Sequence, residues 1–195
     1  MMPNLYIIAG CNGAGKTTAS YTILPEILHC REFVNADSIA AGLSPFNPES
    51  VALEAGRIML QRIHQLKNDK IDFAFETTLS TRSYTSFVKS AQADGYIVTL
   101  LYFWLRSPQL AWQRVAGRVR EGGHNIPTDI ITRRYYRGIF NLFNLYIPIC
   151  NNWMIIDNED VTPEIIARGE QHSAPLILNN YIWDTILQQG KQDAK

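Results

Sequence analysis

The stretch from Gly10 to Thr18 carries the residue types and the spacing of a loop that binds the phosphate groups of a nucleotide. Its sequence, Gly-Cys-Asn-Gly-Ala-Gly-Lys-Thr-Thr, fits the pattern G-x-x-x-x-G-K-[ST] without a gap. The glycines permit a tight backbone whose N–H groups face phosphate oxygens. Lys16 can reach the β- and γ-phosphates, and the Thr17 hydroxyl can ligate a magnesium ion. The residues expected to bind ATP are Gly10, Cys11, Asn12, Gly13, Ala14, Gly15, Lys16, Thr17 and Thr18.

Two carboxylates, Asp37 and Glu76, each stand where a segment expected to be a strand ends. Ligands of open parallel sheets bind beyond the carboxyl ends of the strands, so both side chains can face a substrate. Asp37 is equally well explained as a helix cap. Glu76 either serves the magnesium shell or the acceptor, or is an ordinary polar residue at a strand end. Thr77 and Arg82 follow and complete the candidate acceptor site, although Arg82 taken alone is typical of a surface residue.

Arginines gather between residues 109 and 146, where two helices are expected to meet at a Gly-Gly turn. Arg114 and Arg118 are four residues apart and share one helix face, and Arg133 and Arg134 lie on the second helix. Arginine forks match phosphate oxygens in two-point contacts and stabilise the charge that develops during phosphoryl transfer. The segment is therefore interpreted as a lid, against the alternative that these are solvated surface arginines.

These residues must be positioned by elements that alternate between strand and helix. The apolar run at 96–105 indicates a parallel strand covered on both faces, and apolar residues at helical spacing predict the connecting helices. The layout predicts a P-loop kinase fold with a five-stranded parallel sheet sandwiched by helices, in a single domain over 1–195. The expected strands are 5–9, 32–36, 71–76, 96–105 and 153–157, and the expected helices are 19–28, 38–42, 48–68, 84–93 and 109–121, with another from 128.

The tail over 160–195 gives weaker signals and is expected to pack peripherally. It predicts a short helix over 162–167, an extra strand over 175–178, a terminal helix over 181–189 and a polar, disordered end. Asn158, just before it, follows the fifth strand at a place where an adenine could lie.

Composition narrows the class of protein. The 195 residues carry a formal net charge of zero, which gives no overall attraction to nucleic acid or to an anionic membrane. No apolar run is long enough to span a bilayer, and a core strand at the start leaves no room for a signal peptide. Three cysteines without metal-ligand spacing (Cys11, Cys30 and Cys150) favour a reducing cytoplasm. Cys11 is interpreted as a tolerated loop residue, with a thiol exposed in an empty loop as the alternative, and the lone His124 is interpreted as structural or idle.

Five motifs, in this order, resemble the zeta toxin-like P-loop kinases. They are the phosphate loop at 10–18, Asn35-Ala-Asp-Ser-Ile-Ala-Ala-Gly-Leu-Ser-Pro45, Phe75-Glu-Thr-Thr-Leu-Ser80, Gly122-Gly-His-Asn-Ile-Pro127 and Arg133-Arg-Tyr135. The resemblance covers residues 3–158 and is to a compact branch of that family rather than to the toxins proper.

Zeta toxins use ATP and magnesium to phosphorylate the 3′-hydroxyl of the sugar in UDP-N-acetylglucosamine, and an epsilon-type antitoxin blocks their nucleotide site. The resemblance implies that Asp37 is the base that accepts the proton of the acceptor hydroxyl. It also implies that Lys16 holds the phosphates and that Glu76 contacts the acceptor. The implied partners are a small-molecule acceptor and an antitoxin protein.

The resemblance is less specific for the lid and for the acceptor. It favours Arg118 and Arg134 as catalytic arginines, with Arg114 and Arg133 as rivals. The acceptor pocket after Glu76 does not match residue by residue, so kinase chemistry carries over better than the sugar nucleotide does. Two alternatives stay open: another small-molecule kinase that acts on an antibiotic or a nucleoside, and a non-catalytic regulator that binds ATP.

Overall fold

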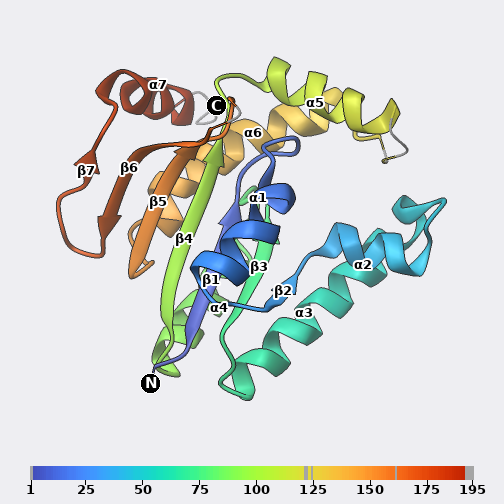
Figure 1. The fold of residues 1–195 in the computed structure, drawn as a ribbon, viewed down its shortest axis with the longest axis horizontal. Coiled ribbons are helices and arrows are strands. Elements are labelled where there is room, and N and C mark those ends of the chain that lie inside the picture. The colour runs from blue at the N-terminus through green and yellow to red at the C-terminus, as the bar shows by residue number, and fades with distance from the viewer. Residues whose placement is uncertain (1, 121–122, 124, 161, 192–195) are drawn as a thin grey trace.

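The computed structural model describes residues 2–120, 123, 125–160 and 162–191. These residues form a seven-stranded sheet in the order β2-β3-β1-β4-β5-β6-β7, with α1 in front of it and α6 behind it in the view of Figure 1. The expectations for His124 and for residues 192–195 fall outside the described residues. The strands are β1 (Asn4–Ala9), β2 (Glu32–Val34), β3 (Phe73–Thr77), β4 (Ile97–Trp104), β5 (Asn152–Asp157), β6 (Glu164–Glu170) and β7 (Leu176–Ile177).

The helices cover both faces of this sheet. None of those in the described ranges combines the length and the apolar character that a membrane crossing requires. They are α1 (Lys16–Thr22), α2 (Ala36–Leu43), α3 (Ala52–Asn68), α4 (Tyr84–Ala93), α5 (Pro108–Arg120), α6 (Thr128–Asn141) and α7 (Asn180–Gly190), with short π or 3-10 turns η1 (Ile23–Ile27), η2 (Pro48–Val51) and η3 (Leu142–Tyr146).

The five strands β1 to β5, which are neighbours in the order β2-β3-β1-β4-β5, are parallel, as the sequence predicts. In the register of β1 and β3, Ile8 is paired with Glu76 and Ala9 with Thr77. The end of β2 lies next to the same part of β3, because Val34 is paired with Phe75. The carboxyl ends of β1, β2 and β3 therefore meet at one edge of the sheet, and the phosphate loop, Asn35 and Glu76 are brought together there.

The helix pair of the predicted lid is anchored through its apolar side. α5 and α6 pack against each other, and the Tyr135 hydroxyl donates a hydrogen bond of 2.7 Å to the Leu105 carbonyl oxygen just after β4. Gly138 faces the Thr78 carbonyl so closely that a Cβ would overlap it, which keeps α6 against the end of β3. The residues predicted to form this apolar side are all buried: Ile131, Tyr135, Ile139, Leu142 and Tyr146.

The prediction of a helix over 162–167 is wrong. This segment forms β6, which runs antiparallel to β5 from Asn152, opposite Glu170, to Asp157, opposite Glu164. The open edge of β5 offers a full row of backbone partners, and consecutive isoleucines suit a pleated surface better than a short helix. The extra strand and the terminal helix predicted for the tail are confirmed, since β7 and α7 lie within a few residues of their expected ranges.

The start of α2 also differs from the expectation. β2 ends at Val34, and α2 begins at Ala36 with Asn35 as its N-cap. The Asn35 side-chain oxygen accepts hydrogen bonds from the backbone N–H groups of Asp37 and Ser38, at 2.8 and 3.2 Å. Asp37 is therefore not the cap but lies in the first helical turn, where its charge suits the positive end of the helix.

Candidate active site

The phosphate loop connects β1 to α1 and has the backbone shape that its glycines require. Gly10 and Gly15 have φ angles of 141° and 78°, values that residues with a Cβ rarely adopt. A Cβ at Gly10 would overlap the Phe103 carbonyl oxygen, and one at Gly15 would overlap the Asn158 side-chain amide. Gly15 also caps α1, so the N-terminus of this helix opens toward the space above the loop. This cradle fits a phosphate chain.

Lys16 is buried at the start of α1 and has two oxygen partners. Its Nζ donates a hydrogen bond of 2.9 Å to the Cys11 carbonyl oxygen and lies 3.4 Å from Glu76 Oε1. A buried ammonium group needs such compensation because burial without a partner is costly. The cation is therefore held inside the loop, beside the space that phosphate groups would occupy.

Thr17, Asn35 and Glu76 form a closed triangle of hydrogen bonds. The Thr17 hydroxyl donates to Glu76 Oε2 at 2.6 Å, and Asn35 Nδ2 donates to the same oxygen at 2.8 Å. Asn35 Nδ2 also lies 3.3 Å from the Thr17 hydroxyl oxygen, which accepts its second N–H. Hydroxyl and carboxylate oxygens are ligands that Mg²⁺ prefers, so Thr17 and Glu76 could serve a magnesium ion at this point.

Asp37 lies beyond this triangle, with its side chain exposed, and lines a cavity of about 960 Å³. The same cavity is lined by the predicted site residues Asn12, Gly13, Gly15, Lys16, Thr17, Thr18, Glu76, Thr77, Arg118 and Arg134, together with Arg114. Polar side chains from the segment after β3 complete the wall, namely those of Thr78, Ser80, Thr81, Ser83 and Tyr84. The cavity thus joins the phosphate loop to a hydroxyl-rich surface next to two carboxylates.

Arg134 of α6 reaches the phosphate loop, where its Nη1 donates a hydrogen bond of 3.1 Å to Asn12 Oδ1. Burial lowers the pKa of its guanidinium below the ordinary value, and the nearby Asp37 charge partly offsets that effect. Its neighbour Arg133 is exposed and does not line the cavity. Of these two rivals, only Arg134 is therefore placed where it can meet a phosphate group.

Arg114 and Arg118 lie on the cavity side of α5 but differ in their surroundings. Arg114 donates to the carbonyl oxygens of Asn158 and Glu159, at 2.9 and 2.6 Å, and so ties α5 to the segment after β5. Arg118 lines the cavity with an exposed side chain. Arg114 therefore stabilises the packing of α5 against the segment after β5, whereas Arg118 faces the cavity.

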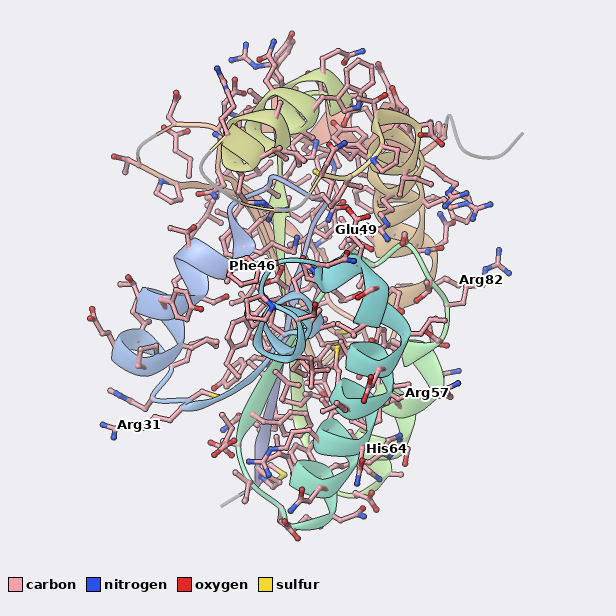
Figure 2. The ribbon with its side chains drawn as sticks, turned by 90° about the vertical axis from the view of Figure 1, so that its right-hand side faces the viewer. Arg31, Phe46, Glu49, Arg57, His64 and Arg82 are labelled. Carbon is pink, nitrogen blue, oxygen red and sulfur yellow. The ribbon has the colours of Figure 1, made fainter. Side chains whose placement is uncertain are left out.

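Two further predicted residues lie away from the cavity. Arg82 is exposed and extends outward from the molecule, as Figure 2 shows. The Cys11 thiol is buried, and burial raises its pKa to about 11, so the alternative of an exposed thiol is wrong and Cys11 is an ordinary buried residue of the loop. Asn158 donates its side-chain amide to the Ala14 carbonyl oxygen at 2.8 Å and so supports the phosphate loop.

Sequence reasoning gave no role to Asn35, which is central to the triangle, nor to Tyr84 at the cavity wall. Asn35 carries one local signal, since asparagine is a favoured N-cap directly before a helix. Its partner Glu76 lies 41 residues further along the chain, and no local sequence pattern predicts a contact over that distance.

A parallel sheet with a glycine-rich phosphate loop after its first strand, and with carboxylates at the ends of the next two strands, defines the class of P-loop kinases. A family model described as Zeta toxin matches residues 1–143. The chain belongs to the zeta toxin family.

Three individual proteins are similar to this chain. An uncharacterized protein of Haemophilus influenzae is 32% identical over 126 residues, which are 65% of this chain and 88% of that protein. A structure of the PezAT chromosomal toxin–antitoxin system of Streptococcus pneumoniae superimposes with a TM-score of 0.69 at 16% identity, covering 97% of this chain and 85% of that one. A gluconokinase of Sinorhizobium meliloti gives a TM-score of 0.51 at 14% identity, covering 82% and 84%. The two structures show the shared fold.

Proposed function

We propose that the chain is an ATP-dependent phosphotransferase that transfers the γ-phosphoryl group to a hydroxyl group of a small molecule. The observation that carries this proposal is the cavity in which the lysine and threonine of the phosphate loop face two carboxylates and the arginines of α5 and α6. UDP-N-acetylglucosamine, phosphorylated at the 3′-hydroxyl of its sugar, is the acceptor that we propose, because the chain belongs to the zeta toxin family.

The loop residues from Gly10 to Thr18 would hold the nucleotide. Lys16 supplies a positive charge, and the start of α1 supplies backbone N–H groups to phosphate oxygens. Thr17, with Glu76 beside it, would hold Mg²⁺, which neutralises phosphate charge when it is bound. Arg134 and Arg118 approach the same space from α6 and α5, where they would offset the charge that develops on the transferred group.

Asp37 is the proposed proton acceptor. Its exposed carboxylate on the first turn of α2 lines the cavity, and it accepts the proton of the acceptor hydroxyl as the new O–P bond forms. The bond between the γ-phosphorus and the bridging oxygen breaks in the same step, and ADP leaves. In a loose transition state the proton is removed late, so the position of Asp37 matters more than its basicity.

The acceptor is proposed to lie against Glu76, Thr77 and the hydroxyl side chains that follow them. Threonine, serine and tyrosine hydroxyls both donate and accept hydrogen bonds, which suits a polyhydroxylated molecule such as a sugar nucleotide. Closure of the segment over 109–146 would keep water out and limit futile hydrolysis of ATP. An antitoxin protein is the proposed partner, in the cytoplasm, where both ATP and sugar nucleotides are found.

The proposal is tested by measuring ADP release from ATP and Mg²⁺, with and without UDP-N-acetylglucosamine, for the wild type and Asp37→Ala. Stimulation by the sugar nucleotide is expected, and the variant should lose turnover on the order of a hundredfold while still binding ATP. If ATP binds but the sugar nucleotide has no effect, other acceptors such as antibiotics and nucleosides are screened. If no acceptor raises ADP release, the chain is a nucleotide-binding regulator and the proposal is wrong.

A further inference from the structure

The Asn35 side chain forms hydrogen bonds with the three elements on which the proposed reaction depends, α1, α2 and β3. It is buried between the end of β2 and the start of α2, with 6% of its surface exposed. Its Oδ1 accepts from the backbone N–H groups of Asp37 and Ser38. Its Nδ2 donates to Glu76 Oε2 at the end of β3 and to the Thr17 hydroxyl on α1.

The orientation of this amide is fixed by its surroundings. Only an oxygen can accept from the two backbone N–H groups of α2, so the NH₂ group must face the carboxylate and the hydroxyl. All the hydrogen-bonding groups of the side chain are then used on four partners. A buried amide satisfied in this way has one stable rotamer and transmits the position of each partner to the others.

We propose that Asn35 is a positioning residue that fixes Asp37 relative to Thr17 and Glu76. This inference rests on the proposed function, in which Asp37 accepts a proton and Thr17 and Glu76 serve Mg²⁺. Asn35 holds the first turn of α2, which carries Asp37, against the metal-facing groups. The distance between the Asp37 carboxylate and the phosphoryl group is thereby held constant. A misplacement of about 1 Å is enough to cost on the order of a hundredfold in rate.

Two substitutions separate this role from simple helix capping. Asn35→Ser and Asn35→Asp both keep an oxygen that can cap α2, because serine and aspartate are favoured N-caps. Both lose the NH₂ group that faces Glu76 and Thr17. They differ in charge, so a result common to both reflects the missing donor and not a new carboxylate.

The chain offers a matched control in Asn179, the N-cap of α7. Its side-chain oxygen accepts from the Ile182 backbone N–H at 3.1 Å, and it does not line the cavity. Asn179→Ser and Asn179→Asp repeat the same chemical changes at a cap remote from the phosphate loop. Their effects on thermal unfolding measure what a change of cap alone does to a helix of this protein.

The decisive readout is the division of the effect between kcat and KM. Both Asn35 variants are expected to lower kcat at least about tenfold, with KM for the acceptor within about threefold of the wild type. Their unfolding temperatures should change no more than those of the Asn179 controls. A kcat within about twofold of the wild type in either variant would overturn the inference.

A second readout does not depend on phosphoryl transfer. Calorimetry gives the dissociation constant of ATP with Mg²⁺ and with a chelator. The constant with chelator divided by the constant with Mg²⁺ reports how well Thr17 and Glu76 hold the metal. For Asn35→Ser we expect this ratio to shrink at least about fivefold, and an unchanged ratio would contradict the inference. A wild type that transfers no phosphoryl group to any acceptor would refute the proposed function, and the binding ratio would still decide the role of Asn35.

Discussion

The Thr17 hydroxyl at the start of α1 donates a hydrogen bond of 2.6 Å to Glu76 Oε2 at the end of β3. The other oxygen of the same carboxylate lies 3.4 Å from Lys16 Nζ. Glu76 therefore binds both Thr17 and Lys16, the two side chains of the phosphate loop that a metal-bound nucleotide would use. A nucleotide has to compete with this carboxylate, or share it through the metal, when it enters the loop.

Glu76→Gln is expected to lower kcat/KM at least about tenfold, because glutamine has no charge for a metal and must turn its NH₂ group toward the donor of either Lys16 or Asn35. ADP formation over a range of Mg²⁺ concentrations measures the effect. Glu32→Gln is the control, since Glu32 pairs with Arg62 at 2.7 Å on a partly exposed surface and should leave kcat/KM unchanged. Wild-type activity in Glu76→Gln would show that the carboxylate has no part in the reaction.

Lys16 and Lys67, the buried lysines of the described residues, should separate activity from stability. Lys16 lies in the phosphate loop, whereas Lys67 of α3 contacts Asp94 and donates to Ser90 Oγ at 3.0 Å. Lys16→Met is expected to abolish ADP formation, because it removes the positive charge that is buried inside the loop. Lys67→Met keeps the apolar stem but loses the contacts with Ser90 and Asp94. It should therefore lower the unfolding temperature and leave kcat intact. The converse pattern, with activity retained in Lys16→Met, would overturn the assignment of the nucleotide site.

The adjacent arginines of α6 form a second matched pair. Arg134 contacts Asn12 of the phosphate loop and lines the cavity, while Arg133 is exposed beside it. Arg134→Ala is expected to reduce kcat on the order of a thousandfold, the scale of arginines that offset charge in phosphoryl transfer. Arg133→Ala should stay within about twofold of the wild type, because exposed surface substitutions are nearly neutral. Single-turnover rates at saturating ATP distinguish the two, and equal losses would show that α6 acts only through packing.

The parts of the fold that the sequence predicts are those with local patterns. The apolar run of β4, the helical spacing of α6 and the glycines of the phosphate loop each specify their element without help from distant residues. The parallel sheet follows, because strands that alternate with helices leave few other arrangements. The class of protein was therefore predictable from the phosphate loop and its flanks.

What the sequence did not predict depends on distant contacts. β6 is a strand because β5 offers an open edge, a fact that residues 162–167 do not encode. Arg133 and Arg134 are identical in type, and only the packing of α6 decides which of them faces the loop. The position of Asn35 on Glu76 likewise depends on the neighbouring ends of β2 and β3.

Asp157 at the end of β5 gives a prediction about pH. Burial raises the pKa of its carboxyl above the ordinary value of 3.8, and the charges of Asp160 and Glu164 act in the same direction. The folded protein thus binds this proton more tightly than the unfolded chain does. The favourable contribution to folding is complete in acid, below the unfolded pKa, and is lost as pH rises through the raised folded pKa.

Asp157→Asn should therefore be more stable than the wild type at neutral pH and should lose this advantage in acid, below the ordinary pKa of 3.8. An asparagine oxygen can still accept the hydrogen bond of 3.0 Å that Glu159 N–H donates to Asp157 Oδ1, so the change removes the charge and keeps the contact. Urea unfolding midpoints across this range of pH measure the difference. Greater stability of the wild type at neutral pH would mean that Arg106 and Arg114, which lower the same pKa, outweigh burial.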